Sequence, residues 1–245
     1  MAKKIKILGI IPARGGSKSI PGKNIKDFLG KPLMAWTIET AKKSGVLDRL
    51  IVSTDDRKIA DIAGKYGVEV PFIRPAKLAR DSTPTLPVLQ HAVKWLEDNE
   101  NYKPDFILLL EVVSPTKRPH HLIEAVKFLT ADKKADSLIT VTEAPAQYNP
   151  HWLLRQDEKG YAKLFTGEDI KKIIPRRQSL PKVYAKNGAF YLFKTDCLFR
   201  DPPSLFGDRS KMFIMDPKYN IDIDGPDDWP IAEQRMRDIL DKENH

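Results

Sequence analysis

Hydrophobic residues along the chain fall into two kinds of stretch, short uninterrupted runs and longer segments with helical spacing. The short runs predict buried strands over residues 5–11, 49–53, 106–110, 137–141, 189–193 and 212–215. Segments with apolar residues at three- and four-residue steps predict amphipathic helices over residues 33–43, 57–66, 86–98, 120–129 and 227–241. This alternation is typical of an α/β fold, in which a mostly parallel sheet carries helices on both faces and binds ligands at the carboxyl ends of its strands.

The pattern breaks between residues 144 and 182, where Pro145, Pro150, Pro175 and Pro181 punctuate a polar stretch with only short apolar pieces. Such a stretch predicts an excursion from the main sheet. Three interpretations stay open: a lid, a loop over the site, or an arm that packs on a partner subunit. The length of 245 residues fits one large α/β domain, or a domain with a small appendage.

Composition places the chain among ordinary globular proteins. Hydrophobic residues make up 41% and charged residues 30%, which excludes the disordered and collagen-like classes. The chain has no uncharged apolar run of about 18 residues, and its first apolar stretch soon reaches Pro12 and Arg14. Neither a membrane span nor a signal peptide is therefore expected. The single cysteine, Cys197, cannot form an intrachain disulfide. We expect a cytoplasmic protein with no membrane partner.

The chain is basic, with 41 Lys and Arg residues against 33 Asp and Glu residues and a formal net charge of +8. This charge is compatible with binding of nucleic acid or of an anionic small substrate, or with a solvated surface. Basic residues are spread along the whole chain rather than gathered into a tail or an aromatic-studded stripe. No nucleic-acid partner is therefore expected.

A glycine-rich basic loop, residues 11–24 with the sequence IPARGGSKSIPGKN, lies directly after the first predicted strand. It brings together three glycines, three cations and a hydroxyl: Gly15, Gly16, Gly22, Arg14, Lys18, Lys23 and Ser17. Glycines allow turns that direct backbone N–H groups at one anion, and the side chains add positive charge and a donor, so a triphosphate would suit the loop. The spacing excludes a Walker loop, because Asn24 follows Lys23, and the GxGxxG fingerprint is missing. The alternative is a solvated basic turn.

Asp222 and Asp224 form an acidic pair before the last predicted helix. On an extended segment, residues two positions apart face the same side, which suits a hard divalent cation held directly or through water. The alternative is an exposed acidic turn in which the following Asp-Gly-Pro-Asp-Asp segment forms an N-cap region.

Motifs in a fixed order along the chain resemble the N-acylneuraminate cytidylyltransferases, also called CMP-sialic acid synthetases. After the loop at 12–24 come IVSTD at 51–55, RPAKLARD at 74–81, RQSLP at 177–181, NGAFY at 187–191 and IDID at 221–224. Together they span nearly the entire chain, which makes the resemblance more specific than any single loop. It implies one Rossmann-like nucleotidyltransferase domain over residues 1–245, with residues 144–182 as a protruding arm that is a candidate for dimerisation.

The reaction that this resemblance implies is Mg²⁺-dependent transfer of CMP. The anomeric hydroxyl of a nonulosonic, sialic-type acid attacks the α-phosphate of CTP, releases pyrophosphate and leaves a CMP-sugar. Such transfer depends on neutralising the triphosphate and aligning nucleophile, phosphorus and leaving oxygen, so cations, backbone donors and a metal do most of the catalysis. The implied partners are CTP, an acidic sugar and a second copy of the chain in a homodimer.

The resemblance also implies a set of site residues. The catalytic ones are Arg14, Lys23, Asp222 and Asp224, with both aspartates as Mg²⁺ ligands. The nucleotide-binding ones are Arg14, Gly15, Gly16, Ser17, Lys23, Asn24, Arg74 and Thr83. The substrate-binding ones are Glu111, Ser114, Arg177, Gln178 and Asn187. A guanidinium at position 177 suits the sugar carboxylate because its fork donates two parallel hydrogen bonds, and in relatives this arm reaches the neighbouring protomer's site.

Two departures from the family pattern affect the acceptor. Relatives commonly read LLQPTSPLR where residues 109–117 read LLEVVSPTK, so Glu111 replaces a glutamine that contacts the sugar. A carboxylate cannot donate a hydrogen bond unless it is protonated, and it repels an acidic substrate. Near Pro150, His151 and Trp152 stand where some relatives supply a sugar-binding lysine. Two alternatives therefore stay open: a cytidylyltransferase for another acidic acceptor, such as another sugar acid or a phosphonate, and a non-catalytic CTP-binding protein.

Overall fold

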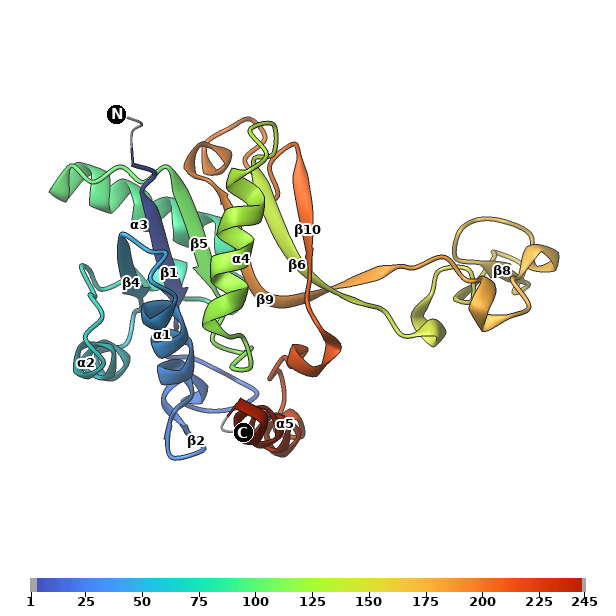
Figure 1. The fold of residues 1–245 in the computed structure, drawn as a ribbon, viewed down its shortest axis with the longest axis horizontal. Helices are drawn as coiled ribbons and strands as arrows, with labels where there is room; N and C mark the ends of the chain where they lie inside the picture. Colours follow the sequence, from blue (N-terminus) through green and yellow to red (C-terminus); the bar gives the residue numbers. More distant parts are fainter. Residues whose placement is uncertain (1–3, 244–245) are drawn as a thin grey trace.

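A six-stranded sheet with strand order β10-β6-β9-β5-β1-β4 forms the centre of the computed structural model, which describes residues 4–243 (Figure 1). The strands are β1 (Ile7–Pro12), β4 (Arg49–Ser53), β5 (Phe106–Leu110), β6 (Ser137–Glu143), β9 (Tyr184–Lys194) and β10 (Ser210–Ile214). β9 runs antiparallel to β5 and β6, and the other pairs are parallel. The mostly parallel sheet expected from the sequence is confirmed. β9 starts at Tyr184 rather than at residue 189, because its first residues pair with β6 outside the apolar run.

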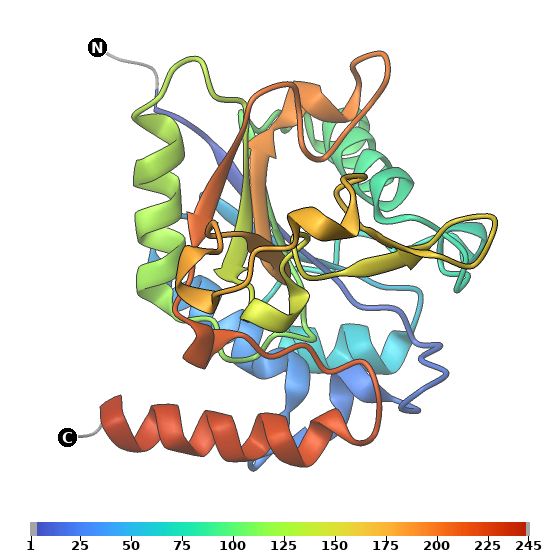
Figure 2. The ribbon, with the colours of Figure 1, turned by 90° about the vertical axis from the view of Figure 1, so that its right-hand side faces the viewer.

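Helices cover both faces of this sheet, as the sequence predicts. They are α1 (Leu33–Ser44), α2 (Arg57–Lys65), α3 (Thr85–Glu100), α4 (Pro119–Thr130) and α5 (Asp228–Glu243). α3 packs on one face, while α1 and α4 pack on the other. α5 crosses beyond the carboxyl ends of the parallel strands (Figure 2). Within residues 4–243, no helix has the length and apolar character needed to span a membrane.

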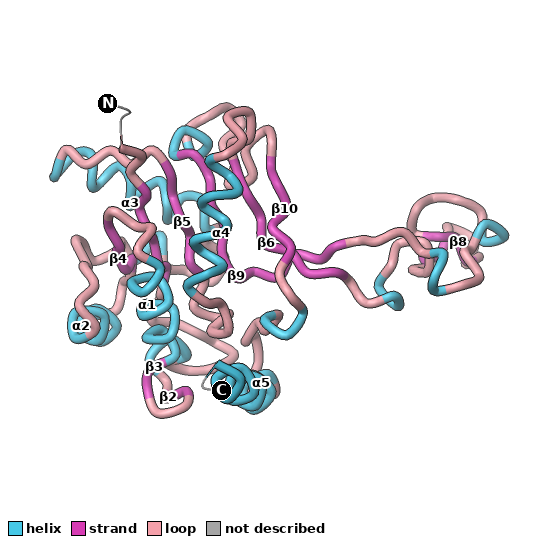
Figure 3. The backbone as a smooth tube through the Cα atoms, viewed as in Figure 1, coloured by secondary structure: helices cyan, strands magenta, loops and turns pink. Residues whose placement is uncertain are grey.

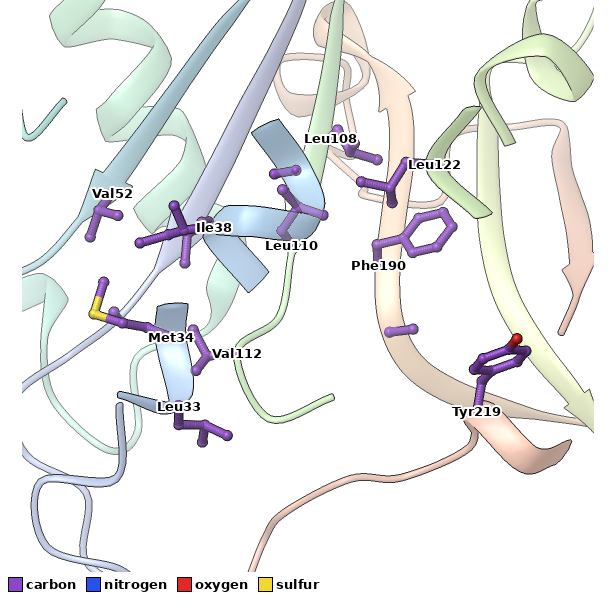
Figure 4. Packing of buried hydrophobic residues seen from close by; sticks show 14 of the residues in the cluster. Leu33, Met34, Ile38, Val52, Leu108, Leu110, Val112, Leu122, Phe190 and Tyr219 are labelled. Atoms are coloured by element: carbon purple, nitrogen blue, oxygen red, sulfur yellow. The ribbon is translucent and has the colours of Figure 1, made fainter. Parts of the chain in front are cut away.

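Alternate side chains of the central strands enter two separate cores, as the period of two along a strand requires. In β1, Leu8 and Ile10 pack with α3, whereas Ile7 and Ile11 pack with α1 and α4. Strands buried on both faces read as continuous apolar runs, which is why the sequence located them well. Figure 4 shows the second core, in which side chains from helices, strands and the segments after them meet: Leu33, Met34, Ile38, Val52, Leu108, Leu110, Val112, Leu122, Phe190 and Tyr219.

Residues 144–183, here called the arm, leave the sheet between β6 and β9 and project away from the rest of the molecule, the body (Figure 3). The arm contains a hairpin of β7 (Leu154–Gln156) and β8 (Ala162–Leu164) and three 3-10 turns, η3 (Ala146–Tyr148), η4 (Ile170–Lys172) and η5 (Arg177–Ser179). Its buried residues are Asn149 and Leu164. The body also carries a small hairpin, β2 (Asp27–Phe28) and β3 (Lys31–Pro32), and four more 3-10 turns: η1 (Lys23–Ile25), η2 (Ala76–Leu78), η6 (Thr195–Leu198) and η7 (Pro217–Tyr219).

Candidate active site

A pocket of about 560 Å³ lies beyond the carboxyl ends of β1 and β5, where an α/β sheet is expected to bind its ligand. Its lining comes from the loop after β1, from the segment that leads into α3, from the end of β5 and from the segment before α5: Pro12, Arg14, Ser17, Lys18, Ser19, Lys23, Asn24, Arg74, Leu78, Arg80, Asp81, Thr83, Thr85, Val88, Glu111, Val112, Val113 and Asp224. Motifs far apart in the sequence therefore meet in one cavity.

The loop after β1 is fixed against the end of β4. The backbone N–H of Gly15 donates to Asp55 Oδ1 over 3.1 Å, and Asn24 Nδ2 donates to the Arg14 carbonyl over 2.9 Å. A Cβ at position 15 would lie 2.7 Å from Asp56 Oδ2, closer than side-chain carbons approach, so the loop can lie this near α2 only with glycine there. The Gly15 amide is thus already engaged by Asp55, while the side chains of Arg14, Ser17 and Lys18 belong to residues that line the pocket.

Lys23 connects this loop to the C-terminal part of the chain. Gly22, with φ of 66°, takes the left-handed conformation that begins η1, and Lys23 Nζ then donates to the Ile223 carbonyl over 2.8 Å. Ile223 is the residue between the two acidic ones, so the ammonium lies among carboxylates. Burial lowers the pKa of Lys23, and the charges of Asp224 and Asp222 oppose that shift.

Asp222 and Asp224 form an acidic pair beside the pocket, and of the two only Asp224 belongs to the pocket lining. Partial desolvation raises the pKa of Asp222, and the neighbouring charge of Asp224 raises it further. Asp228 Oδ2 accepts from the backbone N–H groups of Asp224 and Gly225, which fixes the turn before α5. Carboxylate oxygens are the ligands that Mg²⁺ prefers, and the pair supplies two groups of them. Across residues 4–243, His, Cys, Asp and Glu form no group of three or more able to hold a metal, so other ligands would come from substrate or water.

Arg74 presents a buried guanidinium at the pocket wall. It is 4% exposed, and within residues 4–243 its Nε and Nη2 have no hydrogen-bond partner, although Nη2 lies 3.5 Å from Asp55 Oδ1 in an ion pair. Burial lowers the pKa of Arg74, and Asp55 opposes that shift. Buried donors without acceptors are rare in proteins because they lose hydration without compensation. The pocket therefore suits a ligand with hydrogen-bond acceptors at this position.

Half-buried Glu111 lies at the pocket floor, and fully buried Lys117 lies beneath it. Lys117 is fully buried, and its Nζ donates to the carbonyls of Glu111 over 2.5 Å and of Ser114 over 2.6 Å, which holds the segment after β5 in a tight turn. Burial raises the pKa of Glu111 to about 7, against the opposing charge of Lys117. Burial likewise lowers the pKa of Lys117 to about 7. A carboxyl group whose pKa lies near neutral pH is partly protonated there, and the protonated form can donate a hydrogen bond to a substrate.

Four residues expected at the substrate lie outside the pocket lining. Ser114 is 1% exposed and packs beneath the pocket wall, because Lys117 turns the chain inward there. Asn187 is buried in β9, where Nδ2 contacts Met215 Sδ and Oδ1 accepts from the Ala189 amide. Arg177 and Gln178 are exposed on η5 of the arm, which points away from the body (Figures 1 and 2). Gly15 and Gly16 also lie outside the lining, next to Arg14 and Ser17.

Three charged residues near the pocket were missed by the sequence reasoning. Asp81 forms ion pairs with Arg14 and Lys18, and it is the last residue of the RPAKLARD motif. Lys186 acts electrostatically on both Glu111 and Asp222, and it directly precedes the NGAFY motif. Position in a motif could have drawn attention to these two. For Lys117, no sequence signal distinguishes a fully buried lysine from the many solvated ones.

Comparison with known proteins agrees with this geometry. Residues 8–206 match a family model described as Cytidylyltransferase. Pseudaminic acid cytidylyltransferase of Campylobacter jejuni is 36% identical over 242 residues, 98% of each chain. N-acylneuraminate cytidylyltransferase A of Danio rerio is 34% identical over 94% of this chain and 50% of its own. A CMP:2-keto-3-deoxy-manno-octonic acid synthetase solved with CTP shares the fold, with a TM-score of 0.65, 19% identity and coverage of 97% of this chain and 99% of that one. The resemblance predicted from the motifs is confirmed.

Proposed function

The chain belongs to the cytidylyltransferase family, and from that premise we propose that it transfers CMP from CTP to the anomeric hydroxyl of a nonulosonic acid. The observation that supports this most directly is the arrangement of charge around the pocket. Arg14, Lys18 and Lys23 come from one loop, and Asp224 lines the pocket from the segment before α5. A polyphosphate needs such cations, and its divalent counter-ion needs such carboxylates.

In the proposed reaction the sugar hydroxyl oxygen bonds to the α-phosphorus while the bond from that phosphorus to the bridging oxygen breaks, and pyrophosphate leaves. Arg14, Lys18 and Lys23 neutralise the charge that develops on the phosphate oxygens. Because Lys23 is also anchored to the Ile223 carbonyl, its ammonium is held in place before the substrate arrives. The hydroxyl proton must pass to a base, and a carboxylate of the pair beside Lys23 that the metal leaves free is a candidate.

We propose Asp222 and Asp224 as the residues that hold Mg²⁺, because two adjacent carboxylates fit a cation that also binds substrate phosphates. Burial raises the pKa of Asp222 and the charge of Asp224 raises it further, so a cation at this pair would be favourable. Bound there, the ion would polarise phosphate oxygens and neutralise part of the triphosphate charge.

For the nucleoside, we propose Arg74 as the principal contact, with Asn24 and Thr83 beside it. The unpartnered Nε and Nη2 of Arg74 are donors that match carbonyl and ring-nitrogen acceptors of cytosine. Thr83 is held by its own hydrogen bonds to Arg80 and Lys77, so its backbone has a fixed position at the pocket edge.

In this proposal the sugar substrate is a nonulosonic acid. Glu111 at the pocket floor favours a sugar with a hydrogen-bond acceptor there when its carboxyl group is protonated, and one with a hydrogen-bond donor when it is ionised. The pKa of about 7 allows either state near neutral pH. A different acidic acceptor is the second candidate, because a charged Glu111 repels a carboxylate placed beside it. If Glu111→Gln leaves the relative kcat/KM values across acceptors unchanged, position 111 does not set specificity.

We also propose a homodimer in which the arm of one copy reaches the pocket of the other. Arg177 suits the sugar carboxylate but lies on an arm that projects away from its own pocket. Exposed apolar side chains along the arm support a partner surface: Tyr148, Leu154, Tyr161 and Phe165. Light scattering after size-exclusion chromatography gives the mass that checks this.

The activity is tested by incubating the protein with CTP, Mg²⁺ and a panel of neuraminic, legionaminic and pseudaminic acids, with pyrophosphate release and CMP-sugar formation as readouts. We expect release with at least one acid, and its loss in Asp224→Ala and on chelation of the metal. Glu97→Gln is the matched control and should keep the activity. It removes an exposed carboxylate on α3 that pairs with Lys103.

Absence of release with every acid, including a sugar acid outside this class and a phosphonate, would contradict the enzymatic proposal. Calorimetry then distinguishes the remaining alternative: tight CTP binding without product would indicate a protein that binds CTP and does not turn it over.

A further inference from the structure

A single carboxylate engages two of the three cations of the phosphate loop. Asp81 Oδ1 lies 2.5 Å from Arg14 Nη1, and Asp81 Oδ2 lies 2.7 Å from Lys18 Nζ. The two oxygens of one carboxylate thus bridge two cations, as two oxygens of a phosphate group would. All three residues line the pocket.

Asp81 belongs to a short segment that lines the pocket and lies between Arg74 and α3 in the chain. Residues 76–83, here called the flap, begin with η2 and are tied together locally, because the Thr83 amide donates to the Arg80 carbonyl and Thr83 Oγ1 donates to the Lys77 carbonyl. None of the three residues of η2 is buried. The ion pairs of Asp81 are therefore contacts that connect the outer part of the flap with the loop after β1.

We propose that Asp81 is a latch, a carboxylate that occupies the phosphate-binding cations in the free protein and that the triphosphate must displace on binding. This inference rests on the proposed function, since it takes Arg14 and Lys18 to be phosphate contacts. The hydrogen bond from Lys18, followed by the charges of Arg14 and Lys18, lowers the pKa of Asp81, so the latch carries its negative charge throughout the neutral range.

The latch has two physical consequences. Asp81 competes with the nucleotide for the same donors, so its charge lowers the affinity for any polyphosphate. The competition also favours ligands with several phosphate charges, because a more highly charged anion displaces the carboxylate more readily. Since Lys18 is 84% exposed and Asp81 is 37% exposed, salt screens the ion pairs and the effect is largest at low ionic strength.

The test compares wild type with Asp81→Asn, which keeps the size of the side chain and removes its charge, by calorimetric titration with CTP and separately with inorganic triphosphate. We expect the dissociation constant to fall about threefold to fivefold for both ligands at low salt, and to approach the wild-type value as salt rises. Glu97→Gln is the control for the loss of one exposed negative charge, and it should leave both constants within about 1.5-fold of wild type.

A double variant tests whether the effect acts through the ion pairs. In a Lys18→Gln background, half of the latch is already absent, so Asp81→Asn should change triphosphate affinity by less than it does in wild type. Trypsin cleavage after Lys77 supplies a second measurement, because release of the flap should make that bond about threefold more accessible in free Asp81→Asn than in free wild type.

The outcomes distinguish the latch from the enzymatic proposal. Equal or weaker triphosphate binding by Asp81→Asn would overturn the latch and would make Asp81 a residue that orients Arg14 and Lys18 for the ligand. Failure of both proteins to bind triphosphate would overturn it as well. Tighter binding by the variant, in a protein that forms no CMP-sugar, would leave the latch standing and reject the proposed function.

Discussion

The body and the arm bury the apolar side chains of their strands very differently. Leu108 in β5 is fully buried, whereas Leu154 in β7 is 53% exposed. The body buries side chains on both faces of its sheet, while the arm is organised by local contacts such as the bond from Trp152 Nε1 to the Ile174 carbonyl and from Asn149 Nδ2 to the Pro181 carbonyl. The comparison indicates that the body is stabilised by its own buried cores, whereas the arm exposes apolar side chains that the proposed dimer would cover.

Truncation of matched leucines gives the largest expected contrast. Leu108→Ala removes methyl groups from the core and should lower the free energy of unfolding by about 3 kcal/mol. Leu154→Ala on the exposed hairpin should lower it by less than about 0.5 kcal/mol in dilute, monomeric protein. Urea unfolding followed by circular dichroism measures both. Equal losses would show that the arm has a core of its own.

Removal of a lysine separates the two regions by their part in catalysis. Lys23→Ala should lower kcat by about 100-fold, because the variant loses a charge at the phosphates and the anchor to Ile223. Lys159→Ala, at the exposed turn of the arm hairpin, should change kcat by less than about twofold. Pyrophosphate release at saturating CTP and acceptor measures the change. A Lys23→Ala enzyme with wild-type kcat would remove this residue from the catalytic machinery.

Acid stability distinguishes the regions through a histidine buried in the body. His121 Nδ1 accepts from the Arg118 amide over 3.0 Å, and burial lowers the pKa of His121 to about 3. As pH falls below about 6.5, the unfolded chain takes up a proton that the folded chain refuses, so stability decreases down to pH about 3. His121→Asn keeps a hydrogen-bond acceptor for the Arg118 amide. Between pH 6.5 and 4.5, its free energy of unfolding should fall by about 2 kcal/mol less than that of wild type.

Urea titrations of His121→Asn and of wild type at the two pH values give that difference. His151→Asn, which removes a half-buried histidine from the arm, is the matched control and is titrated in the same way. An unchanged profile in His121→Asn would mean that the buried ring is protonated in the folded protein at pH 4.5.

Complementation between inactive chains tests whether the arm acts across subunits. Co-expressed Lys23→Ala and Arg177→Ala chains should form heterodimers in which one pocket combines an intact body with an intact arm. Random pairing makes half of the dimers mixed, with one of two pockets intact, so about one quarter of wild-type activity is expected. Activity no higher than the sum of the separate variants would show that Arg177 serves its own chain or none.

The fold could be predicted well because its strands are buried on both faces. The run at 106–110 coincides with β5, and the run at 49–53 coincides with β4. The direction of β9 could not be predicted, because an apolar run carries no information on whether its neighbours run parallel to it. The two short hairpins were also missed, because strands of two or three residues contain too few positions for a pattern.

The sequence predicted the pocket residues whose charge indicates their role. It did not predict which side chains tertiary packing turns away from the pocket. Arg14, Lys23 and Asp224 line it, as the charge pattern suggested. Ser114 was expected at the substrate but lies inward, because the ammonium of Lys117 binds its carbonyl from below. This inward turn could not be predicted from the sequence, because a lysine is ordinarily solvated and nothing marks Lys117 as a buried one.

The arm begins and ends on strands that are partners in one ladder, since Glu143 of β6 is opposite Tyr184 of β9. Its two ends are thus held together by the sheet, and the entropy of closing a loop between fixed ends grows only slowly with its length. Related chains can accordingly lengthen, shorten or exchange this excursion with little penalty to the catalytic unit. The junction is therefore a natural graft point, at which the length or sequence of the arm can change while the fold of the body is preserved.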